Sequence, residues 1–443
     1  MPQWLTRHKW LLIVGAVFIG LMVFAACGDD DDDDDGVTPA DGETPVVSTE
    51  PLKIGVLMAF TGGLSDFGPA LEDAARLAAQ EINANGGVLG QDIEIVTGDT
   101  GTDPSQGVTE ATRLIEVEGV HAIVGALSSG VSLPIVESVT GPNNILQISP
   151  ASTSVALIEA NDNDFFFRTT ISDLAQGQVL ATLAEESGLT SVCTMFVNNA
   201  YGQGLSELFA DAFEAAGFTV PAQVPHEEEL TTYASELDTC TAEGPSAIAA
   251  IAYPESAGVF LREAVERGDV DTFLFVDGTK SDAMFADLGW DVFDGMKGTA
   301  PGFLPPGVAA LAFDAAFEAE YGETPPLPFL RETYDAVYLI ALAAETAGST
   351  DPTAIRDALR DVAGPPGEVV AGGPEGYAEG LALIAEGSDI DYAGAAGPVD
   401  FDDVGDVLLG AIETWHVDAA NETFVTDDSF QVDLTTGVVT KIE

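Results

Sequence analysis

Two short segments rich in hydroxyl side chains follow apolar runs that have the composition of buried β-strands. Ser128-Ser129-Gly130 comes shortly after His121-Ala122-Ile123-Val124-Gly125, and Ser149-Pro150-Ala151-Ser152-Thr153 follows Ile145-Leu146-Gln147-Ile148. Hydroxyl groups and free backbone N–H groups where a helix begins are good receptors for a carboxylate. Taken singly, each segment is better explained as an ordinary helix N-cap. Two of them after neighbouring strands favour a binding site.

An acid and three aromatic residues follow other runs of this kind. Asp277 comes directly after the β-rich run 272–276 and could receive a cation, although an exposed aspartate in a turn is the alternative. Phe67, Tyr201 and Tyr253 occupy comparable positions and could form the walls of a ligand pocket. Each of the three could also be a packing residue of a core.

The sequence has none of the common catalytic patterns. Its four histidines are scattered without metal-binding spacing, and H-E-x-x-H, G-x-S-x-G, C-x-x-C and a phosphate-binding Gly-rich loop with Lys are all missing. We therefore predict a protein that binds a ligand without chemistry, needs no cofactor or metal, and is not an enzyme. An extracellular enzyme with an unrecognised site is the remaining alternative.

The segments that must position these residues alternate between β-rich and helical runs. This alternation predicts an α/β fold with parallel sheets covered by helices, and its restart after Arg168 predicts two lobes. Strands are expected at 53–59, 92–96, 121–125, 145–149, 191–197, 247–252, 272–276, 399–401, 408–416 and 432–441. Helices are expected at 69–83, 104–118, 204–216, 233–243, 256–267, 334–347 and 352–362, and a long Gly- and Pro-rich surface loop at 364–376.

These residues together resemble the leucine/isoleucine/valine-binding family of extracellular solute receptors, which supply ABC transporters. The resemblance runs from about Leu52 to about Val417. Six pieces occur in the right order: Ile54-Gly55-Val56 through Thr61-Gly62, Ala84–Gly90, Ser149–Thr153, Phe167–Thr170, Tyr201–Gly204 and Gly397–Phe401.

The resemblance implies a two-lobed periplasmic-binding-protein type I fold. Each lobe would be a mostly parallel sheet flanked by helices, and three hinge crossovers near Thr169, Thr299 and Ala395 would join the lobes. By similarity, residues 52–170 and 301–395 form lobe 1, and residues 171–300 and 396–443 form lobe 2. The lobes would close around a ligand.

In the family, one lobe binds the carboxylate of an amino acid. By similarity, Ser129, Ala151 and Thr153 of this chain would hold it, with Ser128 and Ser152 beside them. The first-lobe disulfide of the leucine receptors has no counterpart, because Asp103 and Ser128 stand near the positions of its cysteines.

The ammonium group would be bound from the second lobe. The resemblance assigns it to Asp277, with Asp173 at another acidic position near the cleft and Phe67, Tyr201 and Tyr253 as aromatic walls. Asp277 is one methylene shorter than the Glu of the leucine receptors, and Phe67 replaces a tyrosine. The ligand class therefore transfers to this chain, whereas the particular amino acid does not.

The expected function is capture of an amino acid, branched-chain or similar, and its delivery to the membrane permease of an ABC transporter. Two alternatives stay open. One is a receptor of the same fold for another small molecule, such as an amide, urea or an aromatic acid. The other is a sensory ligand-binding module, in which closure signals to a partner.

The N-terminal segment has the order of a lipoprotein signal peptide. Arg7 and Lys9 precede the apolar run 10–26, which ends in Phe24-Ala25-Ala26 before Cys27. We expect cleavage of residues 1–26, a lipid on Cys27, and an acidic tether over 27–50. An uncleaved membrane anchor is the alternative, because a spanning helix needs ~17–25 residues. In either case the protein is expected outside the cytoplasm, in the periplasm or on the cell surface.

The net charge of −60 excludes some partners and the cysteines fit an exported protein. Such a charge repels nucleic acid and anionic lipid, so neither is expected as a partner. It indicates either adaptation to a salty habitat or simply high solubility. Cys193 and Cys240 could form a disulfide outside the cytoplasm, and two buried free thiols are the alternative.

Overall fold

The computed structural model describes residues 50–305 and 307–442. The expected signal peptide, Cys27 and nearly all of the expected tether lie outside these residues. Within the described part of the chain, no helix is both long and apolar enough to cross a membrane.

A five-stranded parallel sheet forms the centre of the first lobe, in the order β2-β1-β3-β4-β5. Its strands are β1 (Lys53–Met58), β2 (Glu94–Asp99), β3 (Ala122–Gly125), β4 (Leu146–Ser149) and β5 (Phe166–Arg168). Every residue of β3, β4 and β5 is buried, as expected for parallel strands covered on both faces. The helices of this lobe are α1 (Gly68–Ala84), α2 (Pro104–Arg113), α3 (Ser129–Ile135), α4 (Gly141–Asn143), α11 (Leu330–Ala347) and α12 (Pro352–Ala363).

Two of these helices show how the local sequence sets their limits. Pro69 stands in the first turn of α1, where its missing N–H costs nothing. Asp351 caps α12 by accepting hydrogen bonds from the N–H groups of Thr353 and Ala354. This cap sets the start of the helix that the sequence predicts at 352–362. Helix α11 is buried at every residue from Glu332 to Ala344, because α1 and α12 pack on it as well as the sheet.

The second lobe contains an eight-stranded mixed sheet, in the order β15-β14-β13-β10-β9-β8-β6-β7. Strands β7 to β10 run parallel with β6, whereas β13, β14 and β15 add to β10 in antiparallel fashion. The strands are β6 (Val192–Val197), β7 (Gln223–His226), β8 (Ala247–Ile251), β9 (Phe273–Phe275), β10 (Lys297–Gly302), β13 (Leu409–Asp418), β14 (Thr423–Asp433) and β15 (Val438–Ile442). The helices are α5 (Asp173–Glu186), α6 (Ala200–Ala215), α7 (Ala234–Thr241), α8 (Pro254–Arg267) and α9 (Asp282–Leu288).

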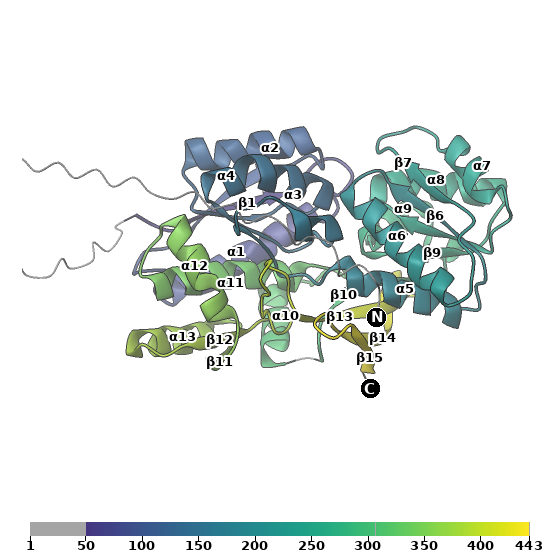
Figure 1. The fold of residues 1–443 in the computed structure, drawn as a ribbon. Coiled ribbons are helices and arrows are strands. Elements are labelled where there is room, and N and C mark those ends of the chain that lie inside the picture. The colour runs from purple at the N-terminus through teal and green to yellow at the C-terminus, as the bar shows by residue number, and fades with distance from the viewer. Residues whose placement is uncertain (1–49, 306, 443) are drawn as a thin grey trace, which may run out of the picture. The chain divides into compact units, whose positions relative to one another are not determined.

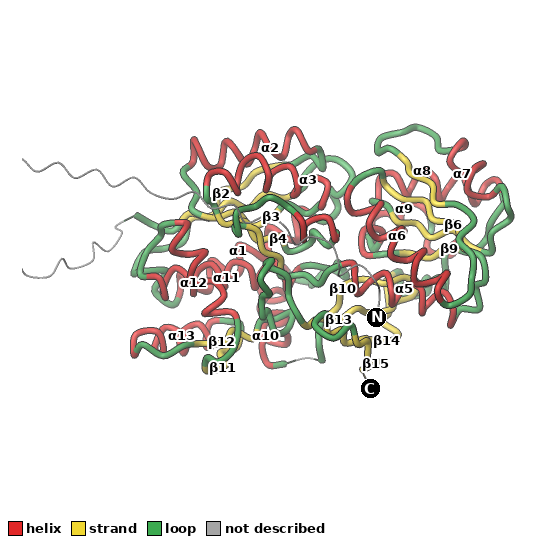
Figure 2. Tube along the Cα trace, in the orientation of Figure 1, coloured by secondary structure: helices red, strands yellow, loops and turns green. Residues whose placement is uncertain are grey.

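The two lobes lie side by side, with α1 to α4 around the first sheet and α6 to α9 around strands β6 to β9 of the second (Figure 1). Figure 2 shows the helices as layers outside the strands of each lobe. The observed fold confirms the predicted α/β class with two lobes. Both lobes belong to one compact unit of the chain.

The chain passes between the two sheets three times. It leaves the first sheet after β5 to enter α5, returns after β10 to enter α10 (Val308–Tyr321), and leaves again between β12 (Ile390–Ala393) and β13. Strand β10 pairs with β13 as far as Gly302, so the second sheet extends two residues past the expected boundary at 300.

Three predicted elements were wrong. The segment 364–376, expected as a loop, contains β11 (Glu368–Ala371), which pairs with β12, and the start of α13 (Pro374–Glu386). Its glycines and prolines stand at the ends of these short elements rather than in one irregular stretch. The expected strand 399–401 makes only an isolated bridge from Phe401 to Val407. The expected strand 432–441 is divided by a turn at Gly437, whose φ is +68°.

Cys193 of β6 and Cys240 of α7 are joined by a disulfide, with 5.7 Å between their Cα atoms. Both residues are almost completely buried in the core of the second lobe, among Met195, Leu237 and Ile248. Of the two alternatives for these cysteines, the structure has the bonded one.

Candidate ligand-binding site

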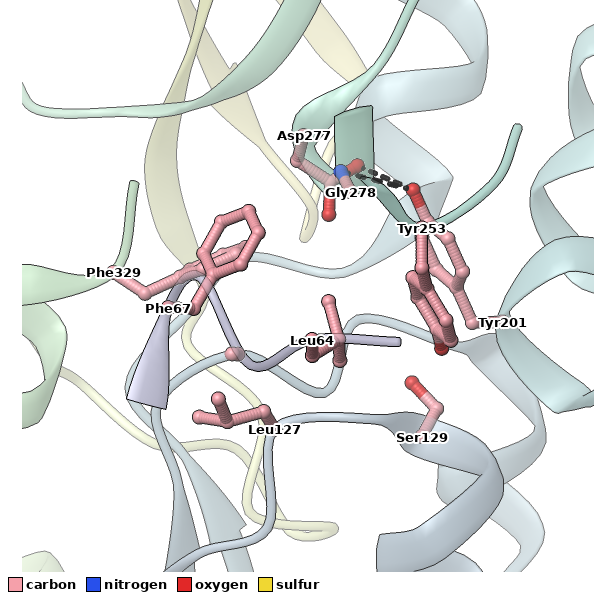
Figure 3. Close-up of a pocket in the computed structure, with 10 residues that line it drawn as sticks. Leu64, Phe67, Leu127, Ser129, Tyr201, Tyr253, Asp277, Gly278 and Phe329 are labelled. Atoms are coloured by element: carbon pink, nitrogen blue, oxygen red, sulfur yellow. Dashed lines mark hydrogen bonds between the residues drawn. The ribbon is translucent and has the colours of Figure 1, made fainter. Parts of the chain in front are cut away.

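A cavity lies between the two lobes, at the carboxyl ends of their strands (Figure 3). The empty space in it is about 330 Å³, a volume that includes its open mouth. Both lobes contribute to its wall. The lining residues are Leu64, Phe67, Leu127, Ser129, Ala151, Tyr201, Tyr253, Asp277, Gly278 and Phe329.

Helix starts and strand ends place most of these side chains. Phe67 and Tyr253 are the N-cap residues of α1 and α8, and Tyr201 stands in the first turn of α6. Ser129 begins α3, and Asp277 begins the 3-10 turn that follows β9. In open α/β sheets ligands bind beyond the carboxyl ends of the strands, so the topology itself brings these residues to one place.

Thr153 has two hydrogen-bond donors without an acceptor among the described residues. Its buried side-chain oxygen Oγ1 and its backbone N–H make no hydrogen bond of normal geometry among the described residues, although the hydroxyl is close enough to the Asp173 carboxyl group to lower the pKa of that acid against the larger effect of its burial. The neighbouring N–H groups differ, because that of Ser152 donates to Ser149 Oγ and that of Ser154 donates to Ser129 Oγ. A buried unpaired donor is costly, which favours a ligand acceptor here.

Asp277 places a buried carboxyl group on the opposite side of the cavity. The Tyr201 hydroxyl donates a 2.7 Å hydrogen bond to Asp277 Oδ1, and Gln176 Nε2 donates another of 2.7 Å to the same oxygen. Burial raises the pKa of Asp277, and these two hydrogen bonds oppose that rise. No Lys, Arg or His of the described residues forms an ion pair with Asp277.

Asp173 lies behind this site and forms no ion pair at contact distance within the described part of the chain, although the charge of Arg168 partly offsets the rise in its pKa that burial causes. It is completely buried at the start of α5, and neither of its carboxyl oxygens has a hydrogen-bond partner among the described residues. Burial, and secondly the charge of Asp277, raise the pKa of Asp173 well above its ordinary value. The charge of Arg168 acts on Asp173, whereas Asp277 has no ion-pair partner among the described residues, so a ligand cation would be favoured beside Asp277.

The remaining wall is apolar. Leu64, Phe67, Leu127 and Phe329 line the part of the cavity opposite the two tyrosines, as Figure 3 shows. Tyr201 and Tyr253 stack with ring centroids 5.7 Å apart and form the facing wall. The arrangement suits a small molecule that has an apolar side chain and one positively and one negatively charged group.

The structure is a closed form, because hydrogen bonds join the lobes around the cavity. The hydroxyls of Ser128 and Tyr253 are 2.9 Å apart, and Ser154 Oγ donates a 2.7 Å bond to the carbonyl of Ala200. Ser281 Oγ donates to Asp66 Oδ2 at 2.5 Å. These contacts exist only while the lobes are together.

Six of the ten residues expected from the sequence line the cavity, and four do not. Ser128 bonds to Tyr253 instead, and Ser152 Oγ donates to the carbonyls of Ala126 and Leu127. Thr153 and Asp173 stand next to lining residues, with the unpaired groups described above. Their direct contact with a ligand stays a prediction.

Four lining residues were missed. Leu64 and Leu127 follow β1 and β3, so the rule that located Ser129 would also have found them. Gly278 directly follows Asp277. Phe329 gave no signal in the sequence: it precedes α11, far along the chain, and adopts a left-handed backbone with φ +75°.

The described residues contain no cluster of three His, Cys, Asp or Glu that could hold a metal ion. The cavity therefore offers hydroxyl, amide, carboxyl and apolar groups only. These groups bind a small organic molecule by hydrogen bonds and charge.

Comparison with known proteins identifies the family. Residues 51–387 match the family model described as periplasmic binding protein, and the chain belongs to this family of solute-binding proteins of ABC-type transporters. The relatives that it matches are binding proteins and not enzymes, and an extracytoplasmic location goes with the family.

Three similar proteins illustrate the range of the family. The chemotactic signal transduction system substrate-binding protein BasB of Halobacterium salinarum is 28% identical over 84% of this chain and 89% of its own length. The Leu/Ile/Val-binding protein homolog 3 of Brucella melitensis is 27% identical over 70% of this chain and 83% of its own. The branched-chain amino acid transporter substrate-binding protein LivJ of Streptococcus pneumoniae, solved with isoleucine, shares the fold with a TM-score of 0.70 and 22% identity, over 89% of this chain and 100% of its own.

Proposed function

We propose that this protein captures a zwitterionic amino acid with an apolar side chain and delivers it to the permease of an ABC transporter. The carboxylate binds to the first lobe at Ser129 and Thr153, and the ammonium binds to Asp277 of the second lobe. The side chain lies against Leu64, Phe67, Leu127 and Phe329.

One observation carries the proposal: Asp277, which has no ion-pair partner among the described residues, lines the closed cleft from the second lobe, and Ser129 lines it from the first, with the buried donors of Thr153 behind it. A zwitterion satisfies both only when the lobes are together, so it binds the closed form better than the open form and shifts the population toward it. A micromolar affinity would correspond to roughly −8 kcal/mol, which charge-assisted hydrogen bonds at both ends can supply.

The ligand and the role of Asp277 are tested together. A thermal-shift screen over the twenty amino acids at low and high salt selects the ligand, and calorimetry then compares wild type with Asp277→Asn. We expect the isosteric variant to lose about a hundredfold or more in affinity, because the ligand ammonium loses the counter-charge that lines the cavity. Asp287→Asn is the matched control, since Asp287 is exposed and pairs only with Arg262. If Asp277→Asn binds the ligand with the affinity of the wild type, the proposed ammonium site is excluded, and an amide, urea or aromatic acid is favoured as ligand.

We further propose that Cys27 carries a lipid and that residues 27–50 tether the protein to the outer face of a membrane. The support is the order of charge, apolar run, small residues and cysteine at the N-terminus. Wild type should partition into the detergent phase of a cell extract, and Cys27→Ala should partition with water or stay uncleaved with its leader. Aqueous partition of the wild type would contradict the lipid anchor.

A sensory role is the second candidate, because the Halobacterium salinarum relative belongs to a chemotactic signal transduction system. The two candidates differ in the membrane protein that the closed form contacts. Cross-linking in intact cells with and without ligand should capture permease subunits if the protein feeds a transporter. Capture of a transducer alone would favour the sensory role.

A further inference from the structure

Arg168 is a completely buried charged side chain near the binding site, although it does not line the cavity. It ends β5 and has no exposed surface. Its Nε and Nη2 donate to the two carboxyl oxygens of Asp406 at 2.5 and 2.6 Å, so the ion pair is bidentate. Burial of a whole guanidinium is costly and calls for a specific reason.

The third nitrogen of Arg168 reaches the loop that carries Thr153. Nη1 donates to the carbonyl oxygens of Ser152 and Ser154 at 3.2 and 2.9 Å. These two carbonyls stand on either side of Thr153. The C=O of Ser152 and the N–H of Thr153 belong to one planar trans peptide unit and point in opposite directions. Holding the carbonyl therefore turns the Thr153 N–H away from Arg168.

This constraint explains why the Thr153 N–H makes no hydrogen bond to the part of the chain that the structure describes, while the N–H groups on either side each make one. The N–H group of Ser152 donates to Ser149 Oγ, and that of Ser154 donates to Ser129 Oγ. Without the guanidinium, the peptide units around Thr153 would be free to rotate, and the two unpaired donors could find acceptors in the protein or in water.

Asp406 connects the same loop to the hinge. It lies in the segment between β12 and β13, which is the third passage between the lobes, and Arg168 stands immediately before the first passage. A backbone hydrogen bond from Arg168 N–H to the carbonyl of Gly405 fastens the two segments a second time. Arg168 thus bonds to the Thr153 loop and to the third hinge segment, and it stands at the start of the first.

We propose that Arg168 is a positioning residue for carboxylate recognition: paired with Asp406, it fixes the Thr153 loop so that the donors of Thr153 face the ligand. The proposal rests on the proposed function, in which Thr153 binds the ligand carboxylate. It predicts that a side chain outside the cavity sets the preference for a carboxylate over a neutral amide.

The experiment uses three variants of the full-length protein. Arg168→Lys keeps the charge but loses the bidentate fork, and Asp406→Asn keeps Arg168 but removes its counter-charge. Arg360→Lys is the matched control: Arg360 also bonds to an aspartate, Asp164, and to the carbonyls of Asp402 and Asp403 in the same hinge segment, but not to the Thr153 loop.

The first measurement needs no ligand. Amide hydrogen exchange of the segment 150–156 should quicken about tenfold or more in Arg168→Lys and less in Asp406→Asn, and stay unchanged in Arg360→Lys. If Arg168→Lys does not fold, the exchange rates measured for Asp406→Asn decide the test. Unchanged exchange in folded Arg168→Lys, or in Asp406→Asn alone when the lysine variant is unfolded, would overturn the proposal.

The second measurement compares L-leucine with L-leucinamide, which lacks the carboxylate. The ratio of their affinities should fall about tenfold in Arg168→Lys, because one charge-assisted hydrogen bond is misaligned. Arg360→Lys should keep the wild-type ratio. An equal loss for both compounds would show that Arg168 supports only the fold and would overturn the proposal. If wild type binds no branched-chain amino acid, the proposed ligand class fails, and hydrogen exchange alone decides the role of Arg168.

Discussion

The hydroxyl groups of Ser128 and Tyr253 lie 2.9 Å apart, although 125 residues separate them and each belongs to a different lobe. Both side chains are buried, and Asn199 Nδ2 also donates to the Tyr253 hydroxyl at 3.2 Å. The pair joins the first hydroxyl loop to the second lobe directly beside the cavity. It therefore stabilises the closed form independently of any ligand.

Removal of the Tyr253 hydroxyl should weaken ligand binding without loss of fold. Tyr253→Phe loses the bond to Ser128, and we expect the ligand affinity to fall about two- to tenfold, the worth of one or two net hydrogen bonds. Calorimetry measures the change. Tyr377→Phe is the control, because the Tyr377 hydroxyl donates to Gly87 within the first lobe and should affect only thermal stability. Equal affinities for wild type and Tyr253→Phe would show that the bond does not contribute to closure.

Closure should take up a proton at Glu228. This carboxyl group of the second lobe abuts Gly63 of the first, since a β-carbon at Gly63 would lie 2.5 Å from Glu228 Oε2. Burial, followed by the charges of Glu255, Glu229, Glu227 and Asp103, raises its pKa from 4.5 to about 7. Opening removes the contact with Gly63 and should lower the pKa toward its ordinary value. The closed form then binds more protons between these two values, so closure is favoured as pH falls through 7.

Calorimetry in two buffers of different ionisation enthalpy measures this proton uptake. Wild type should take up a fraction of a proton on binding ligand near pH 6, and Glu228→Gln should take up less. Glu214→Gln is the control, because Glu214 is exposed and is not among the charges that raise the pKa of Glu228. Identical proton uptake by wild type and Glu228→Gln would contradict the assignment.

Salt should stabilise the fold. Each Lys and Arg among the described residues already forms an ion pair, so most of the acids have no basic partner. With a net charge of −60, the remaining repulsion is screened over ~10 Å at 0.1 M salt but ~3 Å at 1 M. The unfolding midpoint in a thermal scan should therefore rise with NaCl and equally with KCl. A midpoint that falls with added salt would mean that the ion pairs outweigh the repulsion.

The disulfide should stabilise the second lobe. The two cysteines are 47 residues apart in the sequence. Loss of the bond between them should lower the free energy of unfolding by about 2–4 kcal/mol. Denaturant unfolding of the double variant Cys193→Ala/Cys240→Ala measures the change, and reduced wild type is the control. Ligand affinity should stay near wild type, because both cysteines lie in the core away from the cavity lining. An unchanged free energy of unfolding would show that the bond contributes nothing to stability.

Much of the fold follows from local pattern in the sequence. The alternation of β-rich and helical runs is a property of neighbouring residues, because strands and helices each have their own periodicity of burial. It located strands such as β6 and β8 and helices such as α1 and α12 nearly to the residue. It failed for β11, because a short exposed strand between Gly and Pro residues is held by its distant partner β12 and not by its own composition.

The sequence alone determined the candidate polar groups of the site, because parallel strands deliver their following residues to one edge of a sheet. Ser129, Tyr201 and Asp277 could be named in this way. The tertiary structure decided which groups are used up by the protein and which are left for a ligand: Ser152 is bonded internally, whereas Thr153 is not. It also brought Phe329 to the cavity and Arg168 behind Thr153. These relations depend on how separate segments of the chain pack against one another, which no local pattern of residues encodes.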